Sequence, residues 1–152
     1  MAATDIRIDP FRTFNFRVEI DGLAIASFSE VSGLDADRDA IDYREGADPT
    51  NTLRRLPGLS KFTNLVFKLG YVQDDSLWAW YQNIANGNND RRNGAVILMN
   101  EAHQDVLAWN FINAWIGKIQ GPSLNASENK VAIESMDLHH EGLTMEILSA
   151  AA

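Results

Sequence analysis

Two neighbouring histidines, His139 and His140 in "HHEG", are the first residues in this chain whose types could support chemistry. Imidazole is a common metal ligand. Neighbouring residues on a strand point to opposite faces, however, so the pair is poorly placed to bind one ion. The third histidine, His103, lies far away in the sequence. The pattern favours surface or interface histidines, and we expect no metal centre here.

A second candidate is "DADRD", which places Asp35, Asp37 and Asp39 at the spacing of a calcium-binding loop. The EF-hand template then requires glycine at its sixth position and glutamate at its twelfth. Ala40 and Gly46 occupy those positions, so the match fails. An acidic strand face is the favoured interpretation, and a weak calcium site of another kind remains the alternative.

Other catalytic signals are missing from the sequence. It has no cysteine, no glycine-rich phosphate loop and no nucleophile elbow. Four tryptophans could line a sugar site, although their spacing is more typical of a core: Trp78, Trp80, Trp109 and Trp115. We therefore expect no enzyme and no cofactor. A monomeric carbohydrate-binding β-sandwich is the alternative function.

The net charge and the lack of long apolar runs argue against two further classes of protein, nucleic-acid-binding and membrane proteins. The 152 residues include 21 acidic and 13 basic ones, for a net charge of −8. Such a chain repels polyanions, so we expect no sequence-specific nucleic-acid binding. The longest apolar run, 95–99, is too short to span a bilayer, and no membrane insertion by the monomer is expected. The N-terminus lacks the apolar core of a secretion signal.

Alternating apolar residues predict a strand over 14–20, and Asp21-Gly22 predicts a hairpin into a second strand over about 23–31. Another alternating run predicts a strand over 65–71. One helix follows, capped at 74–76 and ended by Asn86-Gly87. Its apolar face comprises Leu77, Trp78, Tyr81, Ile84 and Ala85. Trp80 falls at the edge of this face, where we expect access for a partner.

The C-terminal half predicts strands over 95–101 and 107–119, then a closing pair from 131 to 147. The apolar positions change parity between Ile133 and Met136, which indicates a bulge or a bend. With seven or eight strands and one helix, the predicted fold is mostly β. We expect an antiparallel β-sandwich or small barrel with one flanking helix, in one domain over 1–152.

Two segments do not fit a lone sandwich. Residues 35–45 look extended but are polar on both sides. Residues 41–65 carry charges of both signs, and their apolar residues follow neither helical nor strand periodicity. A loop of that length in a compact domain is usually functional or disordered.

Several segments, in order, resemble the contractile phage tail tube protein family. They are "DPFRTFNFRVEIDGLAIASFSEVSGL" (9–34), "IDYREGADPTNTLRRLPGLSKFTNLVFKLGY" (41–71), "LWAWYQNI" (77–84) and "NKVAIESMDLHHEGL" (129–143). The family includes inner tube proteins of phage-tail-like contractile injection systems, and the type VI secretion tube protein is a distant relative. The resemblance covers nearly the whole chain.

This resemblance implies a structural inner tube protein. Hexameric rings would stack into a hollow tube that a contractile sheath drives through a target envelope. The implied partners are copies of the same chain, the sheath, spike and baseplate proteins, tube-terminating proteins, and cargo in the lumen. The implied location is the bacterial cytoplasm during assembly, then a phage tail or a released extracellular particle. The cargo, DNA or protein, stays open, with the injection particle slightly favoured.

The resemblance also gives residues 41–62 a role, as an arm that docks on neighbouring subunits. Leu53, Leu56 and Leu59 would anchor it, Arg54, Arg55 and Lys61 would meet acidic residues of the neighbour, and Pro49 and Pro57 would limit its freedom. The arm set is completed by Tyr43, Arg44, Glu45 and Asp48. An acidic lumen is the second expectation, with these candidates: Asp35, Asp37, Asp39, Glu134 and Asp137.

Overall fold

The structure is a computed structural model that describes residues 10–23, 28–70, 75–127, 129 and 131–148. This part of the chain forms nine strands and one α-helix. The strands are β1 (Phe16–Ile20), β2 (Glu30–Ser32), β3 (Ala36–Tyr43), β4 (Arg54–Phe62), β5 (Leu65–Gly70), β6 (Arg92–Met99), β7 (Asp105–Gln120), β8 (Ile133–His139) and β9 (Gly142–Ile147). The helix α1 spans Ser76–Ala85.

The long strand β7 joins two antiparallel sheets. Its first half lies between β6 and β9, with β1 beyond β6. Its second half pairs with β8, and β5 and β2 follow. The change of sheet occurs at Asn113, which has φ 53. Asparagine tolerates this left-handed conformation better than most residues, so it suits a bend inside a strand. The predicted β-sandwich is confirmed.

Alternating side chains of both sheets fill the core between them. Leu65, Phe67 and Leu69 of β5 are buried, as are Met136 and Leu138 of β8. The first sheet adds five more buried residues: Val18, Ile20, Val96, Phe111 and Ala114. Because successive strand residues face opposite sides, each strand has one apolar face in this core and one face outside it.

Helix α1 closes one side of the core through Leu77 and Trp80, which are almost fully buried. The Trp80 indole donates to the Asp90 carbonyl at 2.7 Å, and the Arg92 guanidinium lies over its ring, 4.9 Å from the centroid. The expectation that Trp80 is accessible to a partner is wrong. Trp78 is the exposed tryptophan instead, because the helix turns its Trp80 side toward β7.

Two local predictions need correction. The 14–20 strand does not form a hairpin with its successor, since β1 pairs with β6 and β2 pairs with β5. Only one bridge, from Ile20 to Leu23, remains of that turn, and residues 24–27 lie outside the described part. No bulge interrupts β8 against β5. Ile133 is simply exposed, and Glu134 takes the buried position that sequence periodicity assigns to an apolar residue.

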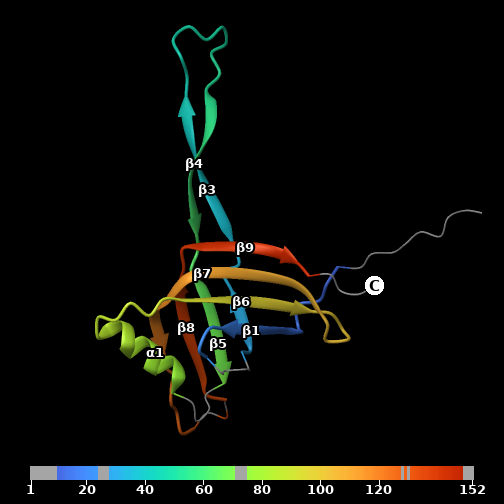
Figure 1. Ribbon diagram of the computed structural model, residues 1–152, viewed down its shortest axis with the longest axis vertical. Coiled ribbons are helices and arrows are strands. Elements are labelled where there is room, and N and C mark those ends of the chain that lie inside the picture. Colours follow the sequence, from blue (N-terminus) through green and yellow to red (C-terminus); the bar gives the residue numbers. More distant parts are fainter. Residues whose placement is uncertain (1–9, 24–27, 71–74, 128, 130, 149–152) are drawn as a thin grey trace, which may run out of the picture.

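Strands β3 and β4 leave the body altogether. They form a separate two-stranded sheet that projects along the longest axis of the molecule (Figure 1). The polar 35–45 segment thus supplies the first arm of one hairpin, and the expected 41–62 arm supplies its tip and its second strand.

Candidate functional site

The projecting hairpin β3–β4 is the most exposed regular element of the described chain. All eight residues of β3 are exposed, and so are seven of nine in β4. Its large apolar side chains keep much of their surface in water: Ile41 52%, Tyr43 44%, Leu53 54%, Leu56 45% and Leu59 79%. A two-stranded hairpin alone is at best marginally stable in water. The element therefore has the character of one half of an interface.

The two faces of the hairpin differ. Ile41 lies directly opposite Leu56, and Tyr43 lies opposite Arg54. Directly paired residues share a face, so Ile41, Tyr43 and Leu56 form one apolar strip. The opposite face carries Arg55, paired with Asp42 at 3.7 Å. Asp39, which pairs with Lys61 at 3.0 Å, falls by strand alternation on the same side as Ile41, nearer the body.

A register shift between Arg38 and Ala40 interrupts the hairpin where Ala40 faces Pro57. Proline is tolerated in a strand at such a bulge because it lacks a donor N–H. Pro57 thus has a structural position within β4 as well as the expected role of limiting freedom.

The hairpin tip is ordered by its own hydrogen bonds. The Tyr43 hydroxyl donates to Glu45 at 3.0 Å, and Arg54 pairs with Asp48 at 2.8 Å. Arg44 donates to the Thr50 carbonyl at 3.3 Å. The cations expected to meet a neighbour, Arg54, Arg55 and Lys61, thus already have acidic partners in their own chain. Their contact with a neighbour stays a prediction.

The base of the hairpin is fixed to the body by His140 and Gly33. One ring nitrogen of His140 lies 3.0 Å from the Thr63 carbonyl, and its ring lies 5.6 Å from that of Phe62. Gly33 has φ 90, and a Cβ there would stand 2.1 Å from the Asn64 carbonyl oxygen. Both residues set the direction in which the hairpin leaves the sheet.

The outer face of the second sheet is polar. Lys68 of β5 is paired with Glu30 at 3.2 Å, and the strand register puts Asp137 opposite both Val66 and Lys118. The face therefore carries two acidic and two basic residues. His139 stacks on Trp115 at the same face, with ring centroids 4.5 Å apart. The two neighbouring histidines thus serve separate structural contacts.

The lumen candidates fall into three places. Asp37 and Asp39 lie on β3 and Asp35 just before it, all on the hairpin side. Asp137 lies on the polar sheet face. Glu134 points to the core side of β8, is only 4% exposed, and its Oε1 finds no hydrogen-bond partner within the described residues. Burial raises the pKa of its carboxyl. A side chain in that position does not line a channel in this conformation.

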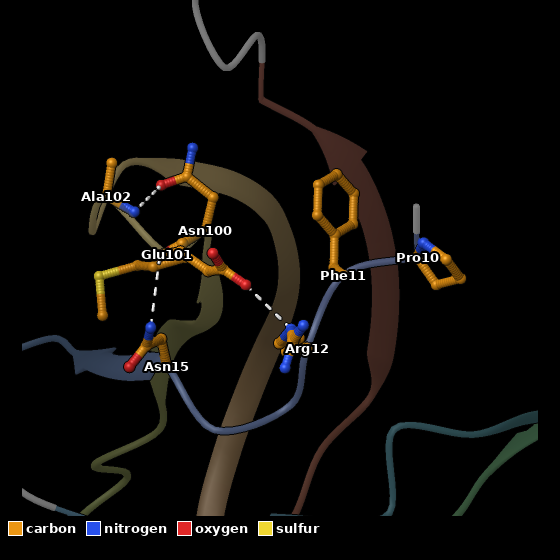
Figure 2. Close-up of a pocket in the computed structure, with 8 residues that line it drawn as sticks. Pro10, Phe11, Arg12, Asn15, Asn100, Glu101 and Ala102 are labelled. Atoms are coloured by element: carbon orange, nitrogen blue, oxygen red, sulfur yellow. Dashed lines mark hydrogen bonds and ion pairs between the residues drawn. The ribbon is translucent and has the colours of Figure 1, made fainter. Parts of the chain in front are cut away.

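A shallow hollow of about 620 Å³ lies where residues 10–15 cross the turn after β6 (Figure 2). Arg12 and Glu101 bridge it at 2.9 Å, and both are mostly exposed. The Ala102 N–H donates to the Asn100 side chain at 2.9 Å. One solvated ion pair supplies neither a nucleophile nor an acid/base pair. The hollow is therefore a surface feature without catalytic groups.

The described residues contain no group of three or more histidines or carboxylates able to hold a metal ion. None of their helices has the length and apolar character that a membrane crossing requires.

The tryptophans do not form a sugar-binding surface. Trp78 lies on the helix, Trp80 in the core, and Trp115 against His139. Trp109 belongs to the apolar side of the first sheet, in line with Val96. The alternative of a carbohydrate-binding module is therefore not supported.

A two-sheet body with one helix, open strand edges and a long exposed hairpin defines a protein built for assembly with copies or partners. A family model for the T4-like virus tail tube protein gp19 matches residues 12–144. The chain belongs to this tail tube family. A search of curated proteins finds no match.

Similar solved structures agree with this family assignment. The chain is similar to one in the cryo-EM structure of an extracellular contractile injection system, the PVC sheath–tube complex in its extended state. The TM-score is 0.81 and the identity 27%, over 91% of this chain and 93% of the other. A chain of the anti-feeding prophage tube-terminating cap gives 0.80 and 25%, over 95% and 97%. Hcp1 from Flavobacterium johnsoniae, at 0.51 and 13% over 85% and 94%, shares the fold alone.

Proposed function

We propose that this tail tube protein forms the inner tube of a contractile injection particle, by stacking rings of identical copies. Its role as a structural tube component of a contractile system follows from the family and from its likeness to tube-containing assemblies. The observation that carries the stacking proposal is the exposed hairpin, whose apolar strip has nothing to cover it in the described chain. Six copies per ring is the number that the family resemblance implies.

Ring closure is supported by free sheet edges. In the described chain, β2 is the last strand of the second sheet, and residues 115–120 of β7 pair on one side only. An open edge exposes unpaired N–H and C=O groups and invites another chain. Joining these two edges between neighbouring copies would continue the sheet around a ring.

The polar face of that sheet, with Glu30, Lys68, Lys118 and Asp137, is our proposed lumen wall. It revises the expected acidic lumen, because its charges balance in number. A balanced, hydrated wall would let either protein or DNA pass without strong adhesion. We favour protein cargo, since the structural neighbours at 25% identity or more belong to injection systems.

We further propose contacts with a sheath, a baseplate and spike, and a tube-terminating protein, and assembly in the bacterial cytoplasm before release. No catalytic activity is part of the proposal, because the family and the structural neighbours support a structural role.

Negative-stain microscopy of the purified protein tests the assembly claim. Rings or tubes are expected above a critical concentration. Deleting residues 48–60 should leave a folded body that does not stack, because the body core contains none of these residues. Substituting Thr52→Ser in the same hairpin is the matched control and should assemble as the parent does. A parent that stays monomeric at high concentration, or normal tubes from the deletion, contradicts the proposal.

A further inference from the structure

Both ring nitrogens of His140 face backbone carbonyl oxygens. Nε2 lies 3.0 Å from the Thr63 oxygen, and Nδ1 lies 3.1 Å from the Gly142 oxygen. A carbonyl oxygen can only accept a hydrogen bond, and a neutral imidazole has a single N–H to donate. In a neutral ring the other nitrogen therefore points its lone pair at an oxygen. Only the doubly protonated ring donates to both carbonyls, so this geometry suits the imidazolium form.

Thr63 holds the two arms of the hairpin together at its base. It lies between β4 and β5, and its hydroxyl donates to the carbonyl of Gly33, just before β3, at 3.2 Å. His140 lies in the short connection between β8 and β9. The N–H of Glu141 in the same connection donates to the Ile112 carbonyl of β7 at 3.0 Å. His140 thus joins a segment anchored on β7 to the residue that holds both arms.

We propose that protonation of His140 fixes the base of the hairpin, so that the direction in which β3–β4 projects depends on pH. Hydrogen bonds from a charged donor are stronger than those from a neutral one, and the charged ring makes two where the neutral ring makes one. Histidine changes its charge between about pH 5 and 8, so acid strengthens this attachment and alkaline conditions weaken it. His140 is then a positioning residue for stacking, a consequence that rests on the proposed tube function.

The charged groups near the ring on the body side have partners of their own. The Glu141 carboxylate accepts from Arg91 and, at 3.0 Å, from the Asn113 side chain. The neighbouring His139 stacks on a tryptophan. Glu146, the acidic residue of β9, accepts from an asparagine of β7 at 3.2 Å.

On the hairpin side, an aromatic ring packs against the imidazole. The ring of Phe62 lies 5.6 Å from that of His140. Asp37 and Lys61 form the next register pair along the hairpin, and strand alternation places them on the other face from Phe62. The pH response of this ring therefore rests on its two carbonyl contacts.

Hydrogen exchange of the dilute, unassembled full chain tests the attachment at about pH 5.5 and about pH 8, with exchange times scaled for the intrinsic rates. In the parent, residues 35–38 and 60–64 at the hairpin base should exchange about two- to tenfold more slowly in acid, the effect of one additional hydrogen bond. His140→Gln has no ring to protonate and should lose this difference. His103→Asn is the matched control. It removes a histidine from the turn after β6, where asparagine tolerates the φ of 60, and should respond as the parent does.

Nitrogen NMR of the parent gives a second measurement that does not depend on a variant folding. In acid, both ring N–H groups of His140 should be protected from exchange with water, as hydrogen-bonded donors are. A parent whose hairpin base exchanges equally at both pH values overturns the proposal. So does a His140→Gln variant that keeps the acid effect, or a doubly protonated ring whose N–H groups exchange rapidly.

Sedimentation of assembled material at the same two pH values separates this proposal from the tube function. Acid lowers the net negative charge and so favours assembly of every variant. The quantity compared is therefore the critical concentration of His140→Gln divided by that of the parent. This ratio should be about two- to tenfold larger in acid, and an equal ratio at both pH values contradicts the link between the hairpin base and stacking. If neither protein forms rings or tubes, the tube function itself fails, while the exchange measurement still decides the attachment.

Discussion

Replacing both residues of the apolar hairpin pair, Ile41→Ser with Leu56→Ser, should weaken tube assembly without unfolding the subunit. In the free chain Ile41 is 52% and Leu56 45% exposed, and they lie opposite each other. Full burial of such a side chain is worth about 1.5–3 kcal/mol, so covering the exposed half of both would contribute about 1.5–3 kcal/mol per hairpin. Since about 1.4 kcal/mol is a tenfold change, the critical concentration should rise about 10- to 100-fold.

The assay is sedimentation of assembled tubes over a dilution series, with the soluble fraction giving the critical concentration. Unfolding of the dilute, unassembled subunit serves as the internal control. It should change little, because a cross-strand pair contributes about 0.2–1 kcal/mol and the body core holds neither residue. A critical concentration within about threefold of the parent's, where tenfold corresponds to about 1.4 kcal/mol, would refute the reasoning.

Three further predictions concern the subunit itself. Hydrogen bonds from Arg92, more than from Asn83, lower the pKa of Asp90, so its contribution to stability is present above its ordinary pKa and is lost as pH falls through the folded value. In denaturant melts, Asp90→Asn should therefore show a smaller loss on acidification than the parent. Burial raises the pKa of Glu134, so the folded chain is penalised once pH rises above the ordinary value. Glu134→Gln should raise the unfolding midpoint at pH 7, with the gain vanishing in acid, and an equal gain at both pH values would contradict this cause. Asn113→Val should cost about 1–2 kcal/mol for its left-handed φ, while Asn113→Gly loses less in thermal melts, which equal losses would disprove.

Much of the architecture could be predicted from periodicity. The alternating residues Leu65, Phe67 and Leu69 predict a strand, and in the structure they lie on one with their side chains buried. The helix spans Ser76–Ala85, as its apolar pattern indicates. Such patterns report which side chains avoid water, and one buried face is enough to define an element.

Which strands pair with each other was less predictable from the sequence. The Asp21-Gly22 turn looked like a hairpin, yet β1 pairs with β6, more than seventy residues away. The pairing of β3 with β4 was also missed, because residues 35–45 carry just two large apolar side chains, Ile41 and Tyr43, too few to reveal a register. Ile41 opposite Leu56, flanked by alternating charges, was the available signal. Trp80 is buried and Trp78 exposed, the reverse of what the helix pattern predicts. Periodicity locates the buried face of a helix only approximately, and packing against β7 sets how the helix is rotated about its axis.

The sequence by itself determined that this chain is mostly β and acidic, with apolar strand faces to bury and a resemblance to tail tube proteins. Only the tertiary structure decided that two unlike polar stretches make one projecting hairpin and that Glu134 is enclosed. The physical reason is that local patterns record burial residue by residue. Strand partners, and the direction in which an uncovered segment points, depend on how distant faces fit together.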